Sequence, residues 1–153
     1  MPRKIKRLFA RLARWWSYRR IVDALTLNNR GGVPGDGLSL SHFHNRLEID
    51  WHARDVHPWD KDLPERQLTE LFVEQCLDDT SAAIERLFCD LPEVDSIDFR
   101  VIDPESSAPI LCGSVARREV EAVEAVDGIS PGMKLKKLGV TYRISDWRFE
   151  PLS

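Results

Sequence analysis

The chain has 153 residues, of which 42% are hydrophobic and 31% are charged, a composition typical of one soluble globular domain with a core of its own. No run approaches the roughly 20 apolar residues that cross a bilayer, and the N-terminus lacks the apolar region of a secretory signal. The three cysteines include no CxxC pair, which argues against a disulfide framework or a cysteine-based zinc site. We therefore expect a cytoplasmic protein that does not span a membrane, although an Arg-rich, acid-poor start also occurs in transit peptides.

Charge is divided unevenly along the chain. Residues 1–30 carry nine Lys or Arg and one acid, a charge of +8, whereas residues 31–153 carry thirteen Lys or Arg and twenty-four acids, a charge of −11. Around this boundary lies NNRGGVPGDG, with four glycines and a proline in ten residues. The sequence therefore predicts a basic amphipathic helical arm over residues 1–27, a flexible linker over residues 28–37 and an acidic α+β domain over residues 38–153.

The arm has the pattern of an amphipathic helix. Its apolar stripe follows i, i+3, i+4 spacing and consists of Ile5, Leu8, Phe9, Leu12 and Trp16. The residues that we expect to dock on a surface are Lys4, Lys6, Arg7, Arg11, Arg14, Trp15 and Trp16. Aromatic side chains beside cations suit an anionic membrane surface, and the same stripe suits a protein partner or the acidic domain itself. We do not expect nucleic acid as the partner, because phosphate binding does not require a continuous apolar stripe.

Beyond the linker the pattern alternates between strands and helices. The clearest strand is RLEIDWHAR over residues 46–54, in which Leu47, Ile49 and Trp51 alternate with polar side chains. The further elements expected are a helix over residues 65–91, a hairpin of strands over 96–103 and 109–115, short helices over 117–126 and 130–138, and one or two strands over 140–151. This β-α-β-β-α-β order is that of the split βαβ or ferredoxin-like fold, so we expect an antiparallel sheet with helices on one face.

Several positions within these elements carry a local expectation. The buried stripe of the long helix should consist of Leu68, Phe72, Cys76, Thr80, Ala83, Leu87 and Leu91, broadened by Leu71 and Ile84. Residues 78–80, Asp-Asp-Thr, predict a kink or a new N-cap within that helix. Gly113 indicates a bulge or a close backbone approach, and Ser130 followed by Pro131 predicts a helix N-terminus.

The stretch over residues 38–60 contains all the histidines of the chain, which are His42, His44, His52 and His57. Converging imidazoles and carboxylates bind divalent metals, so one hypothesis is a metal-dependent hydrolase or nuclease centred on His42, His44 and His52. The other hypothesis is a polar strand face, because the period of the strand places Glu48, Asp50 and His52 away from the core. We favour the polar face and predict no catalytic residue, no metal ligand and no cofactor.

The triplet His42-Phe43-His44 resembles the His-hydrophobic-His motif of HUH nucleases and relaxases. This resemblance covers three residues and implies a sheet of similar topology, a bound metal and a tyrosine that attacks DNA. The only tyrosines here are Tyr18 and Tyr142, and neither has the local surroundings of that nucleophile. A charge of −11 over residues 31–153 also opposes binding of a phosphate backbone.

Trp59 lies in the loop sequence His-Pro-Trp-Asp. An exposed tryptophan would anchor a protein partner, and acids lining a groove beside it would favour a basic or polar one. The alternative is a loop that covers the edge of the sheet. Together these patterns predict a small non-enzymatic binding or adaptor domain, cytoplasmic and peripheral at a membrane where the arm docks there.

Overall fold

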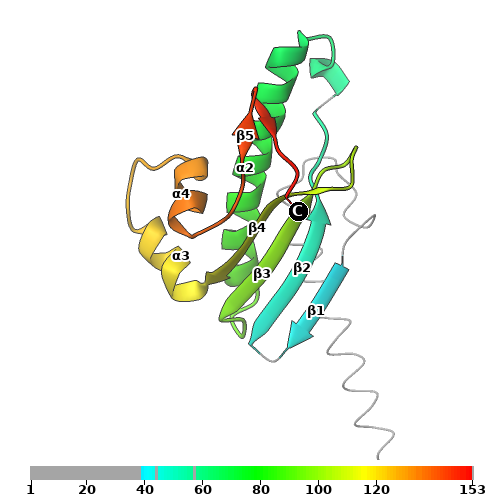
Figure 1. Ribbon diagram of the computed structural model, residues 1–153. Helices are drawn as coiled ribbons and strands as arrows, with labels where there is room; N and C mark the ends of the chain where they lie inside the picture. Colours follow the sequence, from blue (N-terminus) through cyan, green and yellow to red (C-terminus); the bar gives the residue numbers. More distant parts are fainter. Residues whose placement is uncertain (1–38, 44, 57, 153) are drawn as a thin grey trace, which may run out of the picture.

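The computed structural model describes residues 39–43, 45–56 and 58–152, and it has the α+β architecture that the sequence predicts. In chain order the elements are β1 (Ser39–Phe43), β2 (Arg46–His52), the 3-10 turn η1 (Pro58–Asp60), α2 (Glu65–Asp90), β3 (Ser96–Ile102), β4 (Pro109–Ala116), α3 (Arg117–Glu124), α4 (Pro131–Lys137), β5 (Ile144–Ser145) and β6 (Arg148–Phe149) (Figure 1). The predicted arm and linker lie outside the described residues.

The main sheet has the strand order β1-β2-β3-β4 and is mixed. The pairs β1–β2 and β3–β4 are antiparallel, whereas β2 and β3 run parallel, with Ile49 opposite Phe99. The expectation of an antiparallel sheet is therefore wrong at its centre. Since α2 returns the chain along the sheet before β3 begins, β3 starts at the end where β2 started, and the two strands point the same way.

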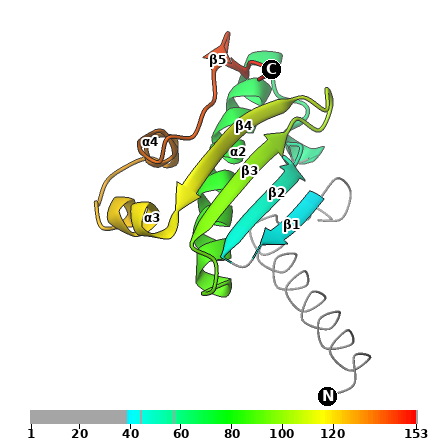
Figure 2. The ribbon, with the colours of Figure 1, turned by 60° about the horizontal axis from the view of Figure 1, so that its bottom comes forward.

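The ferredoxin-like order is not confirmed by the described strands. The place beside β2 is occupied by β1, and the chain ends in a separate two-stranded sheet of β5 and β6. One face of the main sheet packs against α2, and α4 packs in turn against α2 beyond the β4 edge (Figures 1 and 2). The domain therefore has one helical layer on one face of the sheet.

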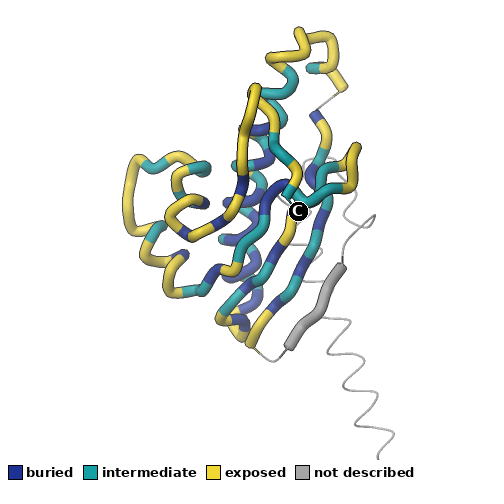
Figure 3. The backbone as a smooth tube through the Cα atoms, viewed as in Figure 1, coloured by how far each residue is buried: buried dark blue, intermediate teal, exposed yellow. Residues whose placement is uncertain are grey.

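The core lies between α2 and the sheet, where buried residues alternate with less buried ones along β2 and β3 (Figure 3). Of the predicted helix stripe, Cys76, Thr80, Ala83, Ile84, Leu87 and Leu91 are buried. Leu68, Leu71 and Phe72 are only half-buried, because the first turns of α2 extend beyond the end of the sheet. The helix also continues through residues 78–80, where the Thr80 hydroxyl donates to the carbonyl of Cys76 at 2.7 Å. The helix is not interrupted there and no new N-cap forms.

Gly113 is a site of close backbone approach, as predicted. A Cβ atom at this position would lie 3.2 Å from Cγ2 and 3.3 Å from Cα of Val140. The approaching segment is held by two backbone hydrogen bonds between Cys112 and Thr141, of 3.1 and 2.8 Å. The predicted N-cap is confirmed as well, because the Ser130 side chain accepts a hydrogen bond from the backbone N–H of Met133 in the first turn of α4.

Candidate functional site

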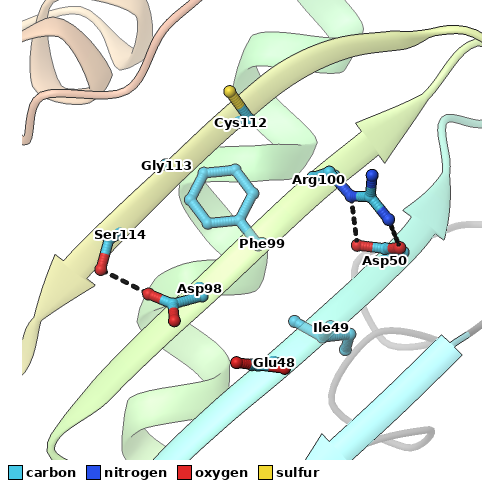
Figure 4. A pocket seen from close by; sticks show the side chains of 9 residues that line it. All are labelled: Glu48, Ile49, Asp50, Asp98, Phe99, Arg100, Cys112, Gly113 and Ser114. Carbon is cyan, nitrogen blue, oxygen red and sulfur yellow. Dashed lines mark hydrogen bonds and ion pairs between the residues drawn. The ribbon is translucent and has the colours of Figure 1, made fainter.

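The face of the sheet opposite α2 carries a hollow of about 540 Å³, which we call the sheet-face groove (Figure 4). Strands β2, β3 and β4 supply its polar side chains, which are Glu48, Asp50, Asp98, Arg100, Cys112 and Ser114. The predicted polar face of residues 46–52 forms one wall of this groove, because Glu48 and Asp50 point away from the buried side of β2. The alternation seen in residues 46–52 thus accounts for two of the six polar side chains of this surface.

Ion pairs cross the groove between neighbouring strands. Arg100 on β3 donates two hydrogen bonds to Asp50 on β2, from Nε at 3.0 Å and from Nη2 at 2.5 Å. These hydrogen bonds raise the pKa of the Arg100 guanidinium above its ordinary value. Asp98 accepts a hydrogen bond from the Ser114 hydroxyl and pairs with Arg46 at 2.6 Å. The carboxylates of the groove are therefore engaged by side chains of the sheet itself, so the groove offers a polar contact surface.

A second hollow of about 590 Å³, which we call the end cleft, opens where β2 and β3 end. Four segments meet there: the loop after β2, the first turns of α2, the β3–β4 turn and the C-terminal stretch from β6. The carboxyl ends of parallel strands are a common place for ligand sites in sheets with crossover helices. The sequence did not reveal this cleft, because its walls come from segments that are far apart in the chain.

The end cleft has an apolar floor and a charged rim. Its floor includes the half-buried Leu68, Phe72 and Phe149, and the rings of Phe72 and Phe149 meet edge to face with 6.2 Å between centroids. The charged side chains at its rim are Asp55, Glu65, Asp103, Glu105, Lys61 and Arg148. The rim thus carries four carboxylates against two cations. This combination suits a ligand with a large apolar group next to positive charge.

The rim cations already pair with rim carboxylates. The Lys61 ammonium lies 3.3 Å from a carboxylate oxygen of Asp55, and Arg148 forms an ion pair with Glu65. Asp103 accepts the backbone N–H groups of Glu105 and Ser106 and so shapes the β3–β4 turn. The Glu105 side chain is exposed at the tip of that turn, and no described cation pairs with it.

Two histidines of the metal hypothesis, His42 and His52, occupy distant positions in the sheet. The strand register places His42 of β1 opposite Leu47 of β2. His52 lies five residues beyond Leu47 on β2, so the backbones of His42 and His52 are about 17 Å apart along the strand direction. His44 and His57 lie outside the described residues. Within the described part of the chain, no three His, Cys, Asp or Glu side chains gather as metal ligands would. Nδ1 of His52 is buried and has no hydrogen-bond partner among the described residues.

The remaining predicted site residues divide between described and undescribed parts of the chain. The docking residues of the arm, Lys4 to Trp16, lie outside the described residues. Trp59 lies on η1 and its side chain is 87% exposed, so it is not a lid over the sheet. It does not line the end cleft, although the acids of that cleft lie close to it in sequence. Trp59 and the end cleft are therefore separate features of the surface.

Burial raises the pKa of several groups that line neither hollow. The Cys76 thiol has a pKa raised to about 12, chiefly by burial and secondarily by the nearby Asp79. Burial also raises the pKa of Asp79, against the lowering effect of its hydrogen bonds to Arg54. Cys76 is part of the buried core, and Asp79 lies on α2 where it pairs with Arg54.

Comparison with known proteins finds no family model, no curated protein and no solved structure that matches this chain. Among the described helices, none combines the length and apolar character needed to cross a membrane.

Proposed function

We propose that this chain is a small, non-enzymatic binding module of the cytoplasm. In this proposal the basic arm docks on an anionic membrane surface or a protein partner, and the acidic domain makes further specific contacts. The observation that carries it is the charge division, +8 over residues 1–30 against −11 over residues 31–153. Two features of the described domain support it: the polar sheet-face groove and the exposed Trp59, which is a side chain suited to anchoring a partner.

The arm has two sources of membrane affinity. Each Lys or Arg near an anionic lipid surface contributes about 1 kcal/mol, an attraction that salt screens within a Debye length. The apolar stripe, which includes Phe9 and Trp16, adds the burial of aromatic side chains at the lipid boundary. Because a single weak signal gives only reversible binding, both sources acting together are needed for docking.

A vesicle co-sedimentation assay with the full chain tests the proposal. We expect sedimentation with vesicles of phosphatidylcholine and phosphatidylserine at low salt, and much less with phosphatidylcholine alone. The substitutions Arg7→Gln, Arg11→Gln and Arg14→Gln together should abolish it. A control with Arg118→Gln, Lys137→Gln and Arg143→Gln removes the same charge from the domain and should sediment like the wild type. If the intact chain does not bind the anionic vesicles, the membrane version is wrong and only the protein-partner version of the proposal remains.

The metal-dependent hydrolase or nuclease receives no support from the described geometry. Three histidines that bind one metal must bring their nitrogens to about 2.1 Å from it. A separation of about 17 Å between the backbones of His42 and His52 is too large for this. Metal analysis of the purified protein checks the point: stoichiometric zinc or manganese, or a clear rise in melting temperature on adding either, would revive the metal hypothesis.

A further inference from the structure

The end cleft has the chemistry to hold an aromatic side chain flanked by cations. Its floor of Leu68, Phe72 and Phe149 is apolar and half-buried, so part of that apolar surface still contacts water. Its volume of about 590 Å³ exceeds that of one large side chain. The exposed carboxylate of Glu105 lies beside this floor and adds negative charge at the opening. A ligand that covers the floor would gain roughly 25 cal/mol for each Å² of apolar surface removed from water.

The chain enters the sheet at the same end as the cleft. β1 begins at Ser39, which pairs with Asp50, and β2 runs from there toward Asp55 on the cleft rim (Figure 1). Five extended residues separate Asp50 from Asp55, a distance of at most about 18 Å. The ten residues 28–37 can span about 33 Å when extended, which is more than this separation. Residues 1–27 are therefore tethered within reach of the cleft.

The tethered segment complements the cleft in charge and in side-chain type. Residues 1–27 contain eight Lys or Arg and one acid, and they include the aromatic residues Phe9, Trp15 and Trp16. The rim of the cleft carries four carboxylates against two cations. Tethering raises the effective concentration of the segment to the millimolar range, so even weak complementarity gives substantial occupancy.

From these observations we infer that the end cleft binds the basic arm, residues 1–27, of the same chain. An aromatic side chain of the arm covers the apolar floor, and neighbouring cations face Glu105 and the other rim carboxylates. The regulatory consequence rests on the proposed function: an arm held in the cleft is withheld from the membrane, so anionic lipid and the cleft compete for one segment. Salt weakens both contacts, since both depend on charge.

Carbodiimide cross-linking of the dilute full chain at low salt tests the docking directly. This reagent joins a lysine to a carboxylate only where the two are in contact. We expect Lys4 or Lys6 to be joined to Glu105 or Glu65 within the monomer, as read by mass spectrometry. Cross-links from these lysines that avoid the cleft acids, or that occur only in dimers, would overturn the inference.

Tryptic cleavage of the arm gives a second, independent measurement. The variant Glu105→Lys should speed cleavage within residues 1–27 roughly fivefold, because it replaces attraction with repulsion at the cleft. The matched control Glu121→Lys makes the same charge change on the exposed face of α3 and should leave the rate unchanged. Equal rates in the wild type and both variants would count decisively against docking.

The vesicle assay separates this inference from the proposed function. If both are right, Glu105→Lys binds anionic vesicles more strongly than the wild type and Glu121→Lys does not. Vesicle binding without cleft cross-links leaves the proposed function in place and rejects the inference. Cleft cross-links in a chain that does not bind vesicles support the inference and reject docking of the arm on a membrane.

Discussion

Arg54 donates two hydrogen bonds to the carboxylate of Asp79, from Nε to Oδ2 at 2.6 Å and from Nη2 to Oδ1 at 3.2 Å. The pair ties the segment after β2 to the middle of α2, and its side chains are only 28% and 17% exposed. Burial, together with the neighbouring charge of Asp78, raises the pKa of Asp79 although Arg54 acts to lower it. The folded protein therefore disfavours the charged form of Asp79, even with Arg54 beside it. This balance predicts the effect of substitutions at the two positions.

We expect the single substitutions Arg54→Met and Asp79→Leu each to lower the free energy of unfolding by about 1–3 kcal/mol, because each leaves a partly buried charge without its partner. The double variant should lose less than either single one, since it removes both charges and keeps apolar volume. Urea denaturation of the four proteins at pH 7 measures the cycle. Additive losses would show that the pair does not interact.

The raised pKa of Asp79 also predicts a pH dependence. A carboxyl group with a raised pKa binds its proton more tightly in the folded state, so its contribution to stability falls as pH rises through that pKa. Arg54→Met removes the influence that lowers this pKa. The stability difference between wild type and Arg54→Met should therefore grow between about pH 4 and pH 7. A stability difference that stays constant over this range would show that Arg54 does not lower the pKa of Asp79.

Arg117 donates hydrogen bonds to backbone carbonyl oxygens at the C-terminal end of α2 and in the turn that follows it. Its guanidinium donates to the carbonyls of Phe88 and Leu91 at 2.8 Å and to that of Val94 at 2.6 Å. Arg117→Ala should cost about 2–3 kcal/mol in unfolding free energy, because these partly buried acceptors lose a charged donor. Arg118→Ala, at the exposed neighbouring position, should change it by less than about 0.5 kcal/mol. Equal losses in the two variants would show that the contacts of Arg117 contribute nothing.

Gly113 leaves little room for a side chain between β4 and the segment at Val140. We expect Gly113→Ala to destabilise the protein by about 1–2 kcal/mol, because the new Cβ would lie 3.3 Å from the Val140 backbone. That backbone is held in place by the Cys112–Thr141 hydrogen bonds, so it cannot move away freely. A melting temperature equal to that of the wild type would contradict this account.

Thiol labelling tests the burial of Cys76. A thiol whose pKa is about 12 holds almost no thiolate at pH 8, and only the thiolate reacts with iodoacetamide. Cys89 is exposed and should be labelled rapidly in the native protein. We expect Cys76 to be labelled only as fast as the protein unfolds, and mass spectrometry of the peptides reads both sites. Labelling of Cys76 at the rate of Cys89 would show that α2 is not packed as described.

The sequence by itself determined the local elements of this protein. Alternation with a period of two predicted β2 and the polar face that became one wall of the sheet-face groove. Helical periodicity predicted α2 almost to its ends, and Ser130 with Pro131 predicted the start of α4. These features depend on residues within a few positions of one another, so they can be read along the chain.

Only the tertiary structure decided which distant segments meet. It placed β2 parallel to β3, set His42 and His52 far apart, and assembled the end cleft from four segments. The two half-buried phenylalanines of its floor come from α2 and β6, and nothing in their local sequence marks them as neighbours. Such contacts arise from the packing of elements against a shared core, and a one-dimensional pattern does not contain that information.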